Sequence, residues 1–259
     1  MSYAEAYSAD RSLYGKLRRR ASKLLFRKPA RLSGLTKPLL TFSFDDAPQS
    51  AAIAGAGILE RHGFHATYFI SAGLMGQDSH FGPYTTAAQI AALNARGHEI
   101  ACHTLTHIDC GKAKAAEIAS SVDENQTLIQ SLGVPTSTTF AYPYGDVSPQ
   151  AKAVMDDRYR SARALHHGLI RSGTDLNQAP AIGIEGEGGE RLALEWMAQA
   201  IKTPQSWLVL YTHDVREDPS PWGCTPETLE TLATAAQTLG FEVVTYAEGA
   251  RRASQRQRA

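Results

Sequence analysis

Short apolar runs alternate with longer segments of helical periodicity along most of the chain. These runs are four to seven residues long, and most of them are rich in apolar β-branched and aromatic residues, which is typical of buried strands. They predict strands at 38–44, 66–70, 98–102, 138–142, 159–163, 181–184, 206–212 and 241–245. Helices are expected between them, at 49–62, 85–96, 111–132 and 189–202, and in segments that begin at Ser148 and Thr225.

Glycines and prolines mark the expected ends of these helices. Gly63, Gly97 and Gly133 each follow a helical segment, where glycine readily adopts the left-handed conformation that ends a helix. Ser148 and Thr225 are each followed by proline, which is the arrangement typical of an N-cap residue and the first helical position. The sequence therefore defines its elements by local signals as well as by periodicity.

The alternation of strands and helices predicts an α/β fold, in which helices cover a parallel sheet. About seven strands in one unit, residues 31–250, favour a (β/α) barrel over an open doubly wound sheet, and 259 residues suit one barrel. Catalytic groups of such barrels lie where strands end and loops begin. The polar residues that follow predicted strands are therefore expected to lie together at one end of the barrel, its mouth. They are Asp45, Asp46, His103, His107, Tyr144 and His213.

The composition limits the partners and the cellular compartment that are expected for this protein. Lys and Arg number 26, as do Asp and Glu, so the formal charge of +0 indicates no nucleic-acid partner. Cys102, Cys110 and Cys224 are too few for a disulfide framework and suit a reducing compartment. No apolar run approaches the ~20 residues of a membrane span, and no signal peptide is apparent, so a cytoplasmic protein is expected.

The two ends of the chain carry an excess of basic residues. Residues 1–30 form an N-terminal segment in which 11–28 is strongly basic and has leucines at helical spacing. This segment is either a basic amphipathic helix on the inner, anionic face of a membrane, or a solvated helix packed on the barrel or a disordered arm, and the second reading is favoured. Residues 251–259 are expected to be a frayed basic tail.

Two adjacent carboxylates, Asp45 and Asp46, follow the strand 38–44. Successive side chains of an extended chain point to opposite faces, so the two carboxylates cannot both lie on one solvated face. One carboxylate could bind a metal while the other acts beside it as a base. The alternative is an ordinary turn, since Asp-Asp-Ala-Pro is also favourable turn sequence.

Two histidines four residues apart, His103 and His107, follow the strand 98–102. They would lie on one face if the segment turned helically, and both imidazoles could then bind one divalent ion. With Asp46 as the oxygen ligand, two histidines and one carboxylate leave an open position, as in catalytic metal sites. The alternative is a capped helix start with two surface histidines.

Two further features at strand ends could serve catalysis. His213 ends a buried strand and could act as a general acid near neutral pH, or it could be a hydrogen-bonded histidine at the edge of the core. In the sequence 140–145, the residues Pro143, Tyr144 and Gly145 fix a tight backbone whose N–H could stabilise an oxyanion. The alternative there is an ordinary strand-to-loop turn.

Together these motifs resemble those of the NodB-homology polysaccharide deacetylases, carbohydrate esterase family 4. The matching stretches occur in the family's order over about 38–246, and they are Ser43-Phe-Asp-Asp46, His103-Thr-Leu-Thr-His107, Phe140-Ala-Tyr-Pro-Tyr-Gly145 and Leu210-Tyr-Thr-His213. The resemblance implies a distorted (β/α) barrel of NodB-homology type and a divalent metal, usually zinc, with cobalt, nickel and manganese as substitutes. It also implies hydrolysis of N-acetyl groups on N-acetylhexosamine residues.

The resemblance also assigns roles to individual residues. Asp46, His103 and His107 would bind the metal, and Asp45 would be the base that deprotonates the attacking water. The backbone N–H of Tyr144 would stabilise the oxyanion next to Pro143, and His213 would protonate the leaving amine. The loop that follows His213 is similar to that of bacterial exopolysaccharide and holdfast deacetylases, and its Trp222 could stack on a sugar or simply anchor the loop.

The sequence departs from the family pattern at two places. The family's third motif commonly holds an arginine near the base, where this chain has Ala141, and Arg163 at a predicted strand end is the candidate replacement. Its alternative is a surface ion pair. The family's fourth motif, an acid and a tryptophan, is not recognisable around 181–189, which leaves open what tunes His213.

These departures keep three functions open. The leading hypothesis is N-deacetylation of a bacterial polysaccharide or its lipid-linked precursor, with an N-acetylated glycan as substrate. The others are hydrolysis of a small cyclic amide or ureide, as by the allantoin-ring hydrolases that share the Phe-Ala-Tyr-Pro-Tyr form, and glycan binding by an inactive barrel. The sequence leaves open whether the chain forms a homo-oligomer.

Overall fold

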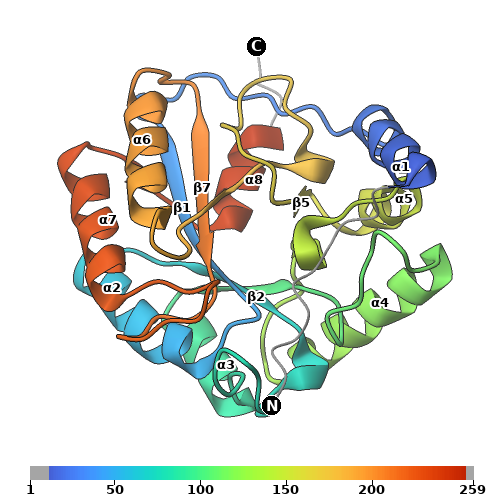
Figure 1. The fold of residues 1–259 in the computed structure, drawn as a ribbon, viewed down its shortest axis with the longest axis horizontal. Helices are drawn as coiled ribbons and strands as arrows, with labels where there is room; N and C mark the ends of the chain where they lie inside the picture. The colour runs from blue at the N-terminus through green and yellow to red at the C-terminus, as the bar shows by residue number, and fades with distance from the viewer. Residues whose placement is uncertain (1–11, 255–259) are drawn as a thin grey trace.

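Parallel strands form the sheet at the centre of the molecule. The computed structural model describes residues 12–254, and within them seven strands run in the order β5-β4-β3-β2-β1-β7-β6, with β8 paired to the start of β1 (Figure 1). The strands are β1 Leu39–Asp45, β2 Thr67–Ile70, β3 Glu99–Cys102, β4 Thr139–Ala141, β5 Ser161–Arg163, β6 Ile182–Gly183, β7 Trp207–Thr212 and β8 Glu242–Val243. The predicted α/β barrel is confirmed, and every expected strand is present.

The ring of strands is distorted where β5 meets β6. The stretch 179–183 crosses this position, because Ala179 pairs with Arg163 of β5 while Ile182 pairs with Leu210 of β7. Ala179 also donates its backbone N–H to Ala162. An irregular segment therefore joins the two edge strands and brings the chain ends of β5 and β6 to the same mouth as β1.

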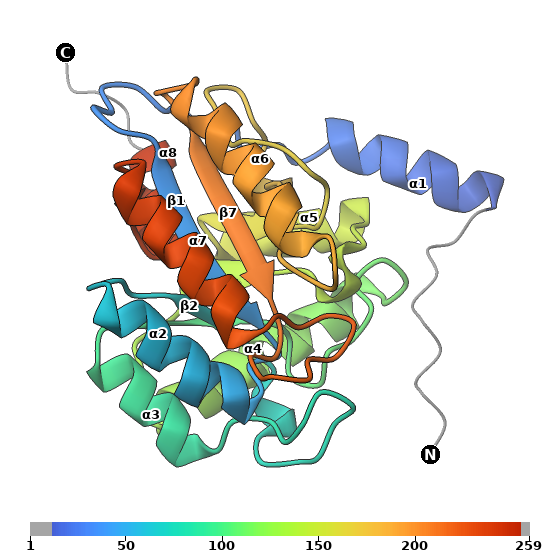
Figure 2. The ribbon, with the colours of Figure 1, turned by 60° about the vertical axis from the view of Figure 1, so that its left-hand side comes forward.

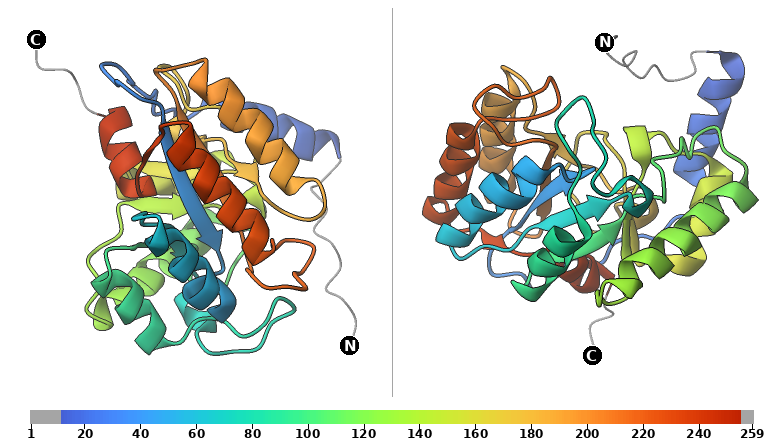
Figure 3. Two further views of the ribbon diagram at one scale, coloured as in Figure 1. Left: turned by 90° about the vertical axis from the view of Figure 1, so that its left-hand side faces the viewer. Right: turned by 90° about the horizontal axis from the view of Figure 1, so that it is seen from below.

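Helices surround this sheet, with α6 and α7 on one side and α4 and α5 on the other (Figures 1 and 3). The helices are α1 Leu13–Leu24, α2 Ala56–Arg61, α3 Ala87–Ala95, α4 Ala115–Ser131, α5 Pro149–Arg158, α6 Gly189–Ile201, α7 Pro226–Thr238 and α8 Tyr246–Ser254. Ser148 and Thr225 cap α5 and α7 as predicted, since each side chain accepts a backbone N–H three residues ahead. Short helical turns occupy Ala51–Gly55, Ala72–Leu74, Pro143–Gly145 and Leu176–Gln178.

Some helix boundaries differ from the sequence prediction. The expected helix at 49–62 contains a π-helical turn, Ala51–Gly55, before α2, and α4 starts at Ala115 rather than at 111. The tail expected from residue 251 is helical up to Ser254 as the end of α8; residues 255–259 lie outside the described part. Arg251 and Arg252 each form ion pairs with Glu248, which holds this last turn in place.

The core is built around the longest strand pair, β1 with β7. Leu39 lies opposite Trp207 and Phe44 lies opposite Thr212, and every residue of both strands is buried. The Trp207 indole N–H donates to Thr41, and α8 packs against its ring at Gly249, where a Cβ would lie 2.4 Å from the indole. Only glycine allows this close approach of helix and indole, so α8 completes the floor of the barrel.

The basic N-terminal segment contains α1, which packs against α5 at the edge of the molecule (Figure 2). The expected helical periodicity is therefore confirmed for Leu13–Leu24, while residues 1–11 lie outside the described part. Between residues 12 and 254, no helix is long and apolar enough to cross a bilayer.

Candidate metal centre and active site

The two carboxylates at the end of β1 both enter the mouth of the barrel. Asp45 is the last residue of the strand, and the backbone turns into the left-handed region at Asp46 (φ 57°) and Ala47 (φ 45°). This turn removes the alternation expected of an extended chain, so neither carboxylate is left on the outer face. Asp45 and Asp46 are 3% and 5% exposed, and the ordinary solvated turn considered from sequence is therefore absent at this position.

Asp46, His103 and His107 converge on one point of the mouth. Each offers one ligand atom, and these atoms lie within 4.8 Å of one another. Asp46 Oδ1 lies 3.9 Å from His103 Nε2, and Asp46 Oδ2 lies 3.7 Å from His107 Nε2. The donor set of two imidazoles and one carboxylate suits zinc, cobalt, nickel or manganese, and it leaves room for further ligands.

The two histidines approach each other through a loop rather than through a helical turn. Thr104 (φ 65°) and His107 (φ 55°) are both left-handed, and the Thr104 hydroxyl accepts the backbone N–H of Ile108. The ring centroids of His103 and His107 lie 4.9 Å apart. The helical i, i+4 arrangement expected from the spacing is therefore wrong, although both imidazoles face Asp46. Left-handed residues curl the chain tightly enough to replace the helical turn.

The environment of the three residues fits a bound cation. Burial lowers the pKa of His103 and of His107 to about 4, so both rings are neutral at pH 7 and keep a lone pair for a metal. His103 Nδ1–H donates to the carbonyl of Ala141 at 2.8 Å, which leaves Nε2 as the ligand atom. Asp46 Oδ1 is buried without a hydrogen-bond partner, and a divalent ion would satisfy this oxygen.

Asp45 is paired with Arg163, the residue suggested from sequence to replace the missing arginine. Arg163 ends β5, is fully buried, and donates from Nη2 to Asp45 Oδ1. Its guanidinium lies between two rings, 4.9 Å from the centroid of Phe69 and 5.0 Å from that of Tyr211. The surface ion pair considered as the alternative is thus excluded for Arg163, because the pair is buried in the mouth.

The charge of Arg163 also determines the ionisation of Asp45. Burial alone would raise the pKa of Asp45, but Arg163, with smaller contributions from His103 and His213, holds it below the usual value. Asp46 behaves differently, since burial and the neighbouring Asp45 raise its pKa against the opposing effect of His103 and His213. The mouth therefore keeps one carboxylate ionised and leaves the other in need of a cation.

Replacing Arg163 by glutamine is expected to lower kcat by up to about 100-fold, because Asp45 loses both its positioning contact and its counter-charge. Since Arg163 lowers the pKa of Asp45, its removal raises that pKa, and the acid limb of the kcat/KM profile should move to higher pH. Arg160→Gln, an exposed position at the other end of β5, is the matched control. An unshifted acid limb in the Arg163 variant would contradict the assigned pairing.

His213 is oriented by a residue that the sequence prediction missed. Glu185 Oε1 lies 3.2 Å from His213 Nδ1, and the carbonyl of Trp222 lies 3.2 Å from the same nitrogen. Tyr211 donates its hydroxyl to Glu185 at 3.4 Å. Glu185 follows β6 within two residues, so the rule that placed the other polar residues at strand ends could have found it.

Glu185 gives His213 the proton affinity of an acid catalyst. Burial would lower the pKa of His213, but the hydrogen bond that His213 donates to Glu185 and the charges of Asp45 and Asp46 raise this pKa to about 9. The imidazole is therefore protonated at neutral pH, with Nδ1 directed at Glu185. This arrangement answers the question of what tunes His213 in the absence of the usual fourth motif.

Glu185→Gln is expected to move the alkaline limb of the kcat/KM profile to lower pH. The neutral amide removes the negative charge that holds the pKa of His213 near 9, so the acid form is lost sooner as pH rises. Activity at pH 9 should fall roughly ten-fold, with a smaller change at pH 6. Glu187→Gln changes an exposed acid of the same loop and serves as the control. An alkaline limb that stays in place would refute the role of Glu185.

The remaining predicted residues line the entrance to the metal centre. Tyr144 is left-handed (φ 59°), 42% exposed, and its ring centroid lies 4.5 Å from that of His107. Pro143 is buried within the same turn. The ring of Trp222 packs against His80 with centroids 4.9 Å apart, and the Trp222 carbonyl accepts the backbone N–H of His213. Trp222 thus both anchors its loop and reaches the mouth.

His80 is a second residue that sequence reasoning did not single out. It lies on the loop between Ala72–Leu74 and α3, next to Phe81, whose ring lies 5.7 Å from that of His213. Burial and the nearby His213 lower the pKa of His80, whereas Asp46 opposes this effect. No motif or strand end marks this position, so only the folded loop reveals that it faces the metal ligands.

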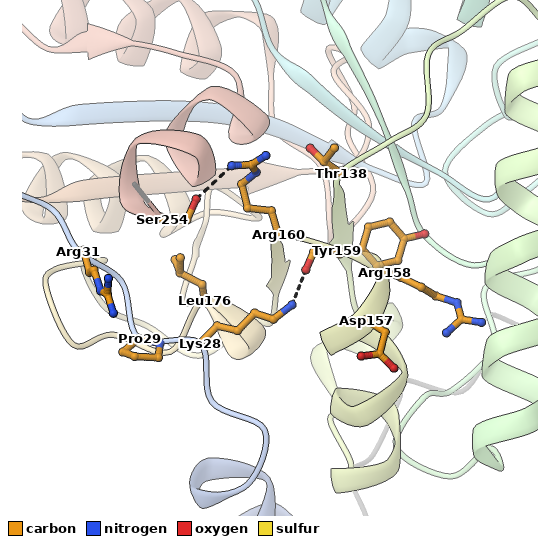
Figure 4. Close-up of a pocket in the computed structure, with 10 residues that line it drawn as sticks. All are labelled: Lys28, Pro29, Arg31, Thr138, Asp157, Arg158, Tyr159, Arg160, Leu176 and Ser254. Atoms are coloured by element: carbon orange, nitrogen blue, oxygen red, sulfur yellow. Dashed lines mark hydrogen bonds between the residues drawn. The ribbon is translucent and has the colours of Figure 1, made fainter. Parts of the chain in front are cut away.

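A separate hollow of about 630 Å³ lies at the opposite edge of the sheet (Figure 4). It is bordered by Thr138 and Arg160, which immediately precede β4 and β5, and by Lys28 and Pro29 beyond α1. The Lys28 ammonium donates a hydrogen bond to the carbonyl of Tyr159 and forms an ion pair with Asp156. This hollow contains none of the residues that converge on the metal centre, so it is not part of the catalytic mouth.

Comparison with known proteins finds family similarity in one part of the chain. Residues 33–159 match the model of the family described as polysaccharide deacetylase. A bifunctional xylanase/deacetylase of Pseudobutyrivibrio xylanivorans is 30% identical over 110 residues, 42% of this chain, and a chitin deacetylase of Pestalotiopsis sp is 28% identical over 113 residues, 44% of this chain. The matches cover only 17% and 36% of those two relatives.

Solved structures extend the similarity of fold to most of the chain. A family 4 acetyl xylan esterase from Clostridium thermocellum, in complex with a cobalt ion, aligns with a TM-score of 0.54 and 23% identity over 81% of this chain and 89% of that one. A CE4 family pseudoenzyme from Bacillus anthracis aligns with a TM-score of 0.53 and 14% identity over 82% and 65% of the two chains. The curled barrel is therefore that of carbohydrate esterase family 4.

Proposed function

The chain carries a polysaccharide deacetylase domain with the fold of carbohydrate esterase family 4, and on this premise we propose that it removes N-acetyl groups from N-acetylhexosamine residues of a polysaccharide or its precursor. One observation carries the proposal. A base, a set of metal ligands and an acid meet at one mouth, and the base and the acid each have a buried partner that sets their ionisation.

Asp46, His103 and His107 are the residues that would hold the divalent ion, with zinc as the proposed metal. When bound, such an ion would polarise the acetyl carbonyl and lower the pKa of the attacking water. Asp45 is ionised and held by Arg163, so it can take the proton from that water. The backbone at Tyr144, beside His107, would support the oxyanion that forms on the carbonyl oxygen.

Hydrolysis of an amide and hydrolysis of an ester differ in the leaving group. An amine leaves only after its nitrogen is protonated, whereas an alkoxide leaves with less assistance. His213 carries a proton at neutral pH because Glu185 stabilises its cation, and it can deliver this proton from Nε2 as the C–N bond breaks. Acetate and a free amino sugar are then the products, which favours an N-acetylated over an O-acetylated substrate.

The aromatic residues at the mouth are suited to binding a sugar ring. Exposed Tyr144 packs beside His107, and Trp222 packs against His80, so aromatic side chains lie close to the residues of the proposed metal centre. Aromatic side chains offer flat apolar surfaces of the kind on which sugar rings stack, and Pro143 holds the Tyr144 turn. We propose that a hexosamine residue of a polymer or of a lipid-linked glycan binds against these aromatic side chains.

Acetate release from a panel of substrates tests the proposal. N-acetylglucosamine oligomers, acetylated xylan and allantoin would be offered to the zinc-loaded protein, and the oligomers are expected to release acetate fastest. Faster release from acetylated xylan would make the protein an esterase, and ring opening of allantoin would make it a cyclic ureide hydrolase. Sugar binding without any product, with metal bound, would identify it as an inactive barrel.

A further inference from the structure

Helix α1 has its apolar face turned away from the protein. Leu13, Leu17 and Leu24 are 78%, 62% and 76% exposed, although helices on a globular surface normally bury such residues. At 100° per residue these leucines fall within an arc of about 40°, directly opposite the fully buried Ser22. The chain continues this apolar surface with Leu25 and Phe26, which are 47% and 46% exposed.

Polar contacts hold the inner face of α1. The Ser22 hydroxyl donates to the carbonyl of Val147 at 3.0 Å, and the buried Lys152 donates to the carbonyl of Ser22 at 2.7 Å. Arg18 forms a buried ion pair with Asp146 at 2.8 Å. The helix is therefore fixed to the body without using its leucines, which remain available for another surface.

Basic residues flank the exposed leucines. Lys16, Arg20 and Lys23 are exposed and follow one edge of the apolar arc, and residues 11–28 contain no aspartate or glutamate. An apolar stripe bordered by lysine and arginine is the arrangement by which helices lie in the interface of an anionic bilayer. A second copy of the chain is disfavoured as the occupant, because two such faces would bring their cations together.

We propose that this face, formed by Leu13, Leu17, Leu24, Leu25 and Phe26 with Lys16, Arg20 and Lys23, docks on a membrane surface that contains anionic lipids. Arg18 and Ser22 tie α1 to the two residues that follow the Pro143–Gly145 turn. Docking would therefore hold the catalytic mouth near the lipid surface, where a lipid-linked glycan would be presented. This last consequence rests on the proposed function, whereas docking itself does not.

Flotation with vesicles tests the docking directly. The full chain is expected to float with vesicles of phosphatidylcholine and phosphatidylglycerol, to float poorly with phosphatidylcholine alone, and to dissociate in high salt. The double variant Leu17→Ser/Leu24→Ser should bind anionic vesicles about ten-fold more weakly or worse, and Lys16→Gln/Arg20→Gln/Lys23→Gln should lose the preference for anionic lipid. Ile53→Ser/Leu239→Ser, two exposed apolar positions elsewhere, should bind like the wild type.

Zinc content and melting temperature are measured on every variant, so that a folding defect is distinguished from a lost surface. Wild-type protein that fails to float, or leucine variants that float unchanged, would overturn the proposal. It would also be overturned by a lipid-free dimer in sedimentation velocity that the two serine substitutions dissociate, since the face would then be an interface between copies. Because flotation requires no turnover, an inactive protein that docks would leave the inference standing.

Discussion

Replacing Asp45 by asparagine is expected to lower acetate release by about 10²–10⁴-fold while the protein keeps its metal. Asparagine preserves the size of the side chain but cannot take a proton from the attacking water. Asp45 contacts Arg163 rather than belonging to the group of ligand atoms, so its loss leaves Asp46, His103 and His107 in place. Turnover of an N-acetylglucosamine oligomer and bound zinc per chain are the two measurements.

The neighbouring substitution Asp46→Asn is the matched comparison, because it makes the same chemical change one residue further along the chain. It removes a ligand charge, so bound zinc should fall together with activity. The two variants therefore separate a base from a ligand. Loss of zinc from Asp45→Asn with retention by Asp46→Asn would reverse the two assignments. The Asp45 variant also leaves buried Arg163 without its counter-charge, so the melting temperature of this variant must be recorded to exclude simple unfolding.

Removal of one imidazole should abolish both metal binding and catalysis. His107→Ala leaves only Asp46 and His103 at the centre, and two ligands hold a divalent ion weakly, so zinc per chain should fall from near one to near zero. Acetate release should fall by at least about 10³-fold, because neither the carbonyl nor the water is then activated. Elemental analysis and the acetate assay on the same preparations provide the test.

Chelation of the wild-type protein should reproduce this loss reversibly. Activity is expected to return with zinc, cobalt, nickel or manganese, and a ligand that binds only the folded state at 100 times its Kd adds about 2.7 kcal/mol to the free energy of unfolding. His167→Ala, an exposed histidine far from β3 in sequence, should keep its zinc and its activity. Full activity after exhaustive chelation would refute a metal-dependent reaction.

Local sequence signals predicted most of the fold. Every strand lies at its predicted position and most are short apolar runs, and the caps at Ser148 and Thr225 are where hydroxyl and proline chemistry requires them. Periodicity and capping act over a few residues, so they can be read without knowing the partner of any element. Helix α8 was not among the expected helices, although Glu248 precedes Arg251 and Arg252 by three and four residues, which is the spacing of ion pairs on a helix.

The sequence by itself predicted several of the polar residues at the mouth, among them Asp45, His103 and His213, since parallel strands deliver their carboxyl ends to one side of a barrel. Only the tertiary structure decided which of them touch. Arg163 contacts Asp45, which lies 118 positions away in the chain, and Glu185, just after the two-residue strand β6, contacts His213. Strand order and register bring these strand ends together. The orientation of α1 was decided in the same way. Its leucine spacing predicts an apolar face, but the contacts of Ser22 and Arg18 turn that face outward. Periodicity depends on neighbours along the chain, whereas pairing and orientation depend on groups that only folding brings near.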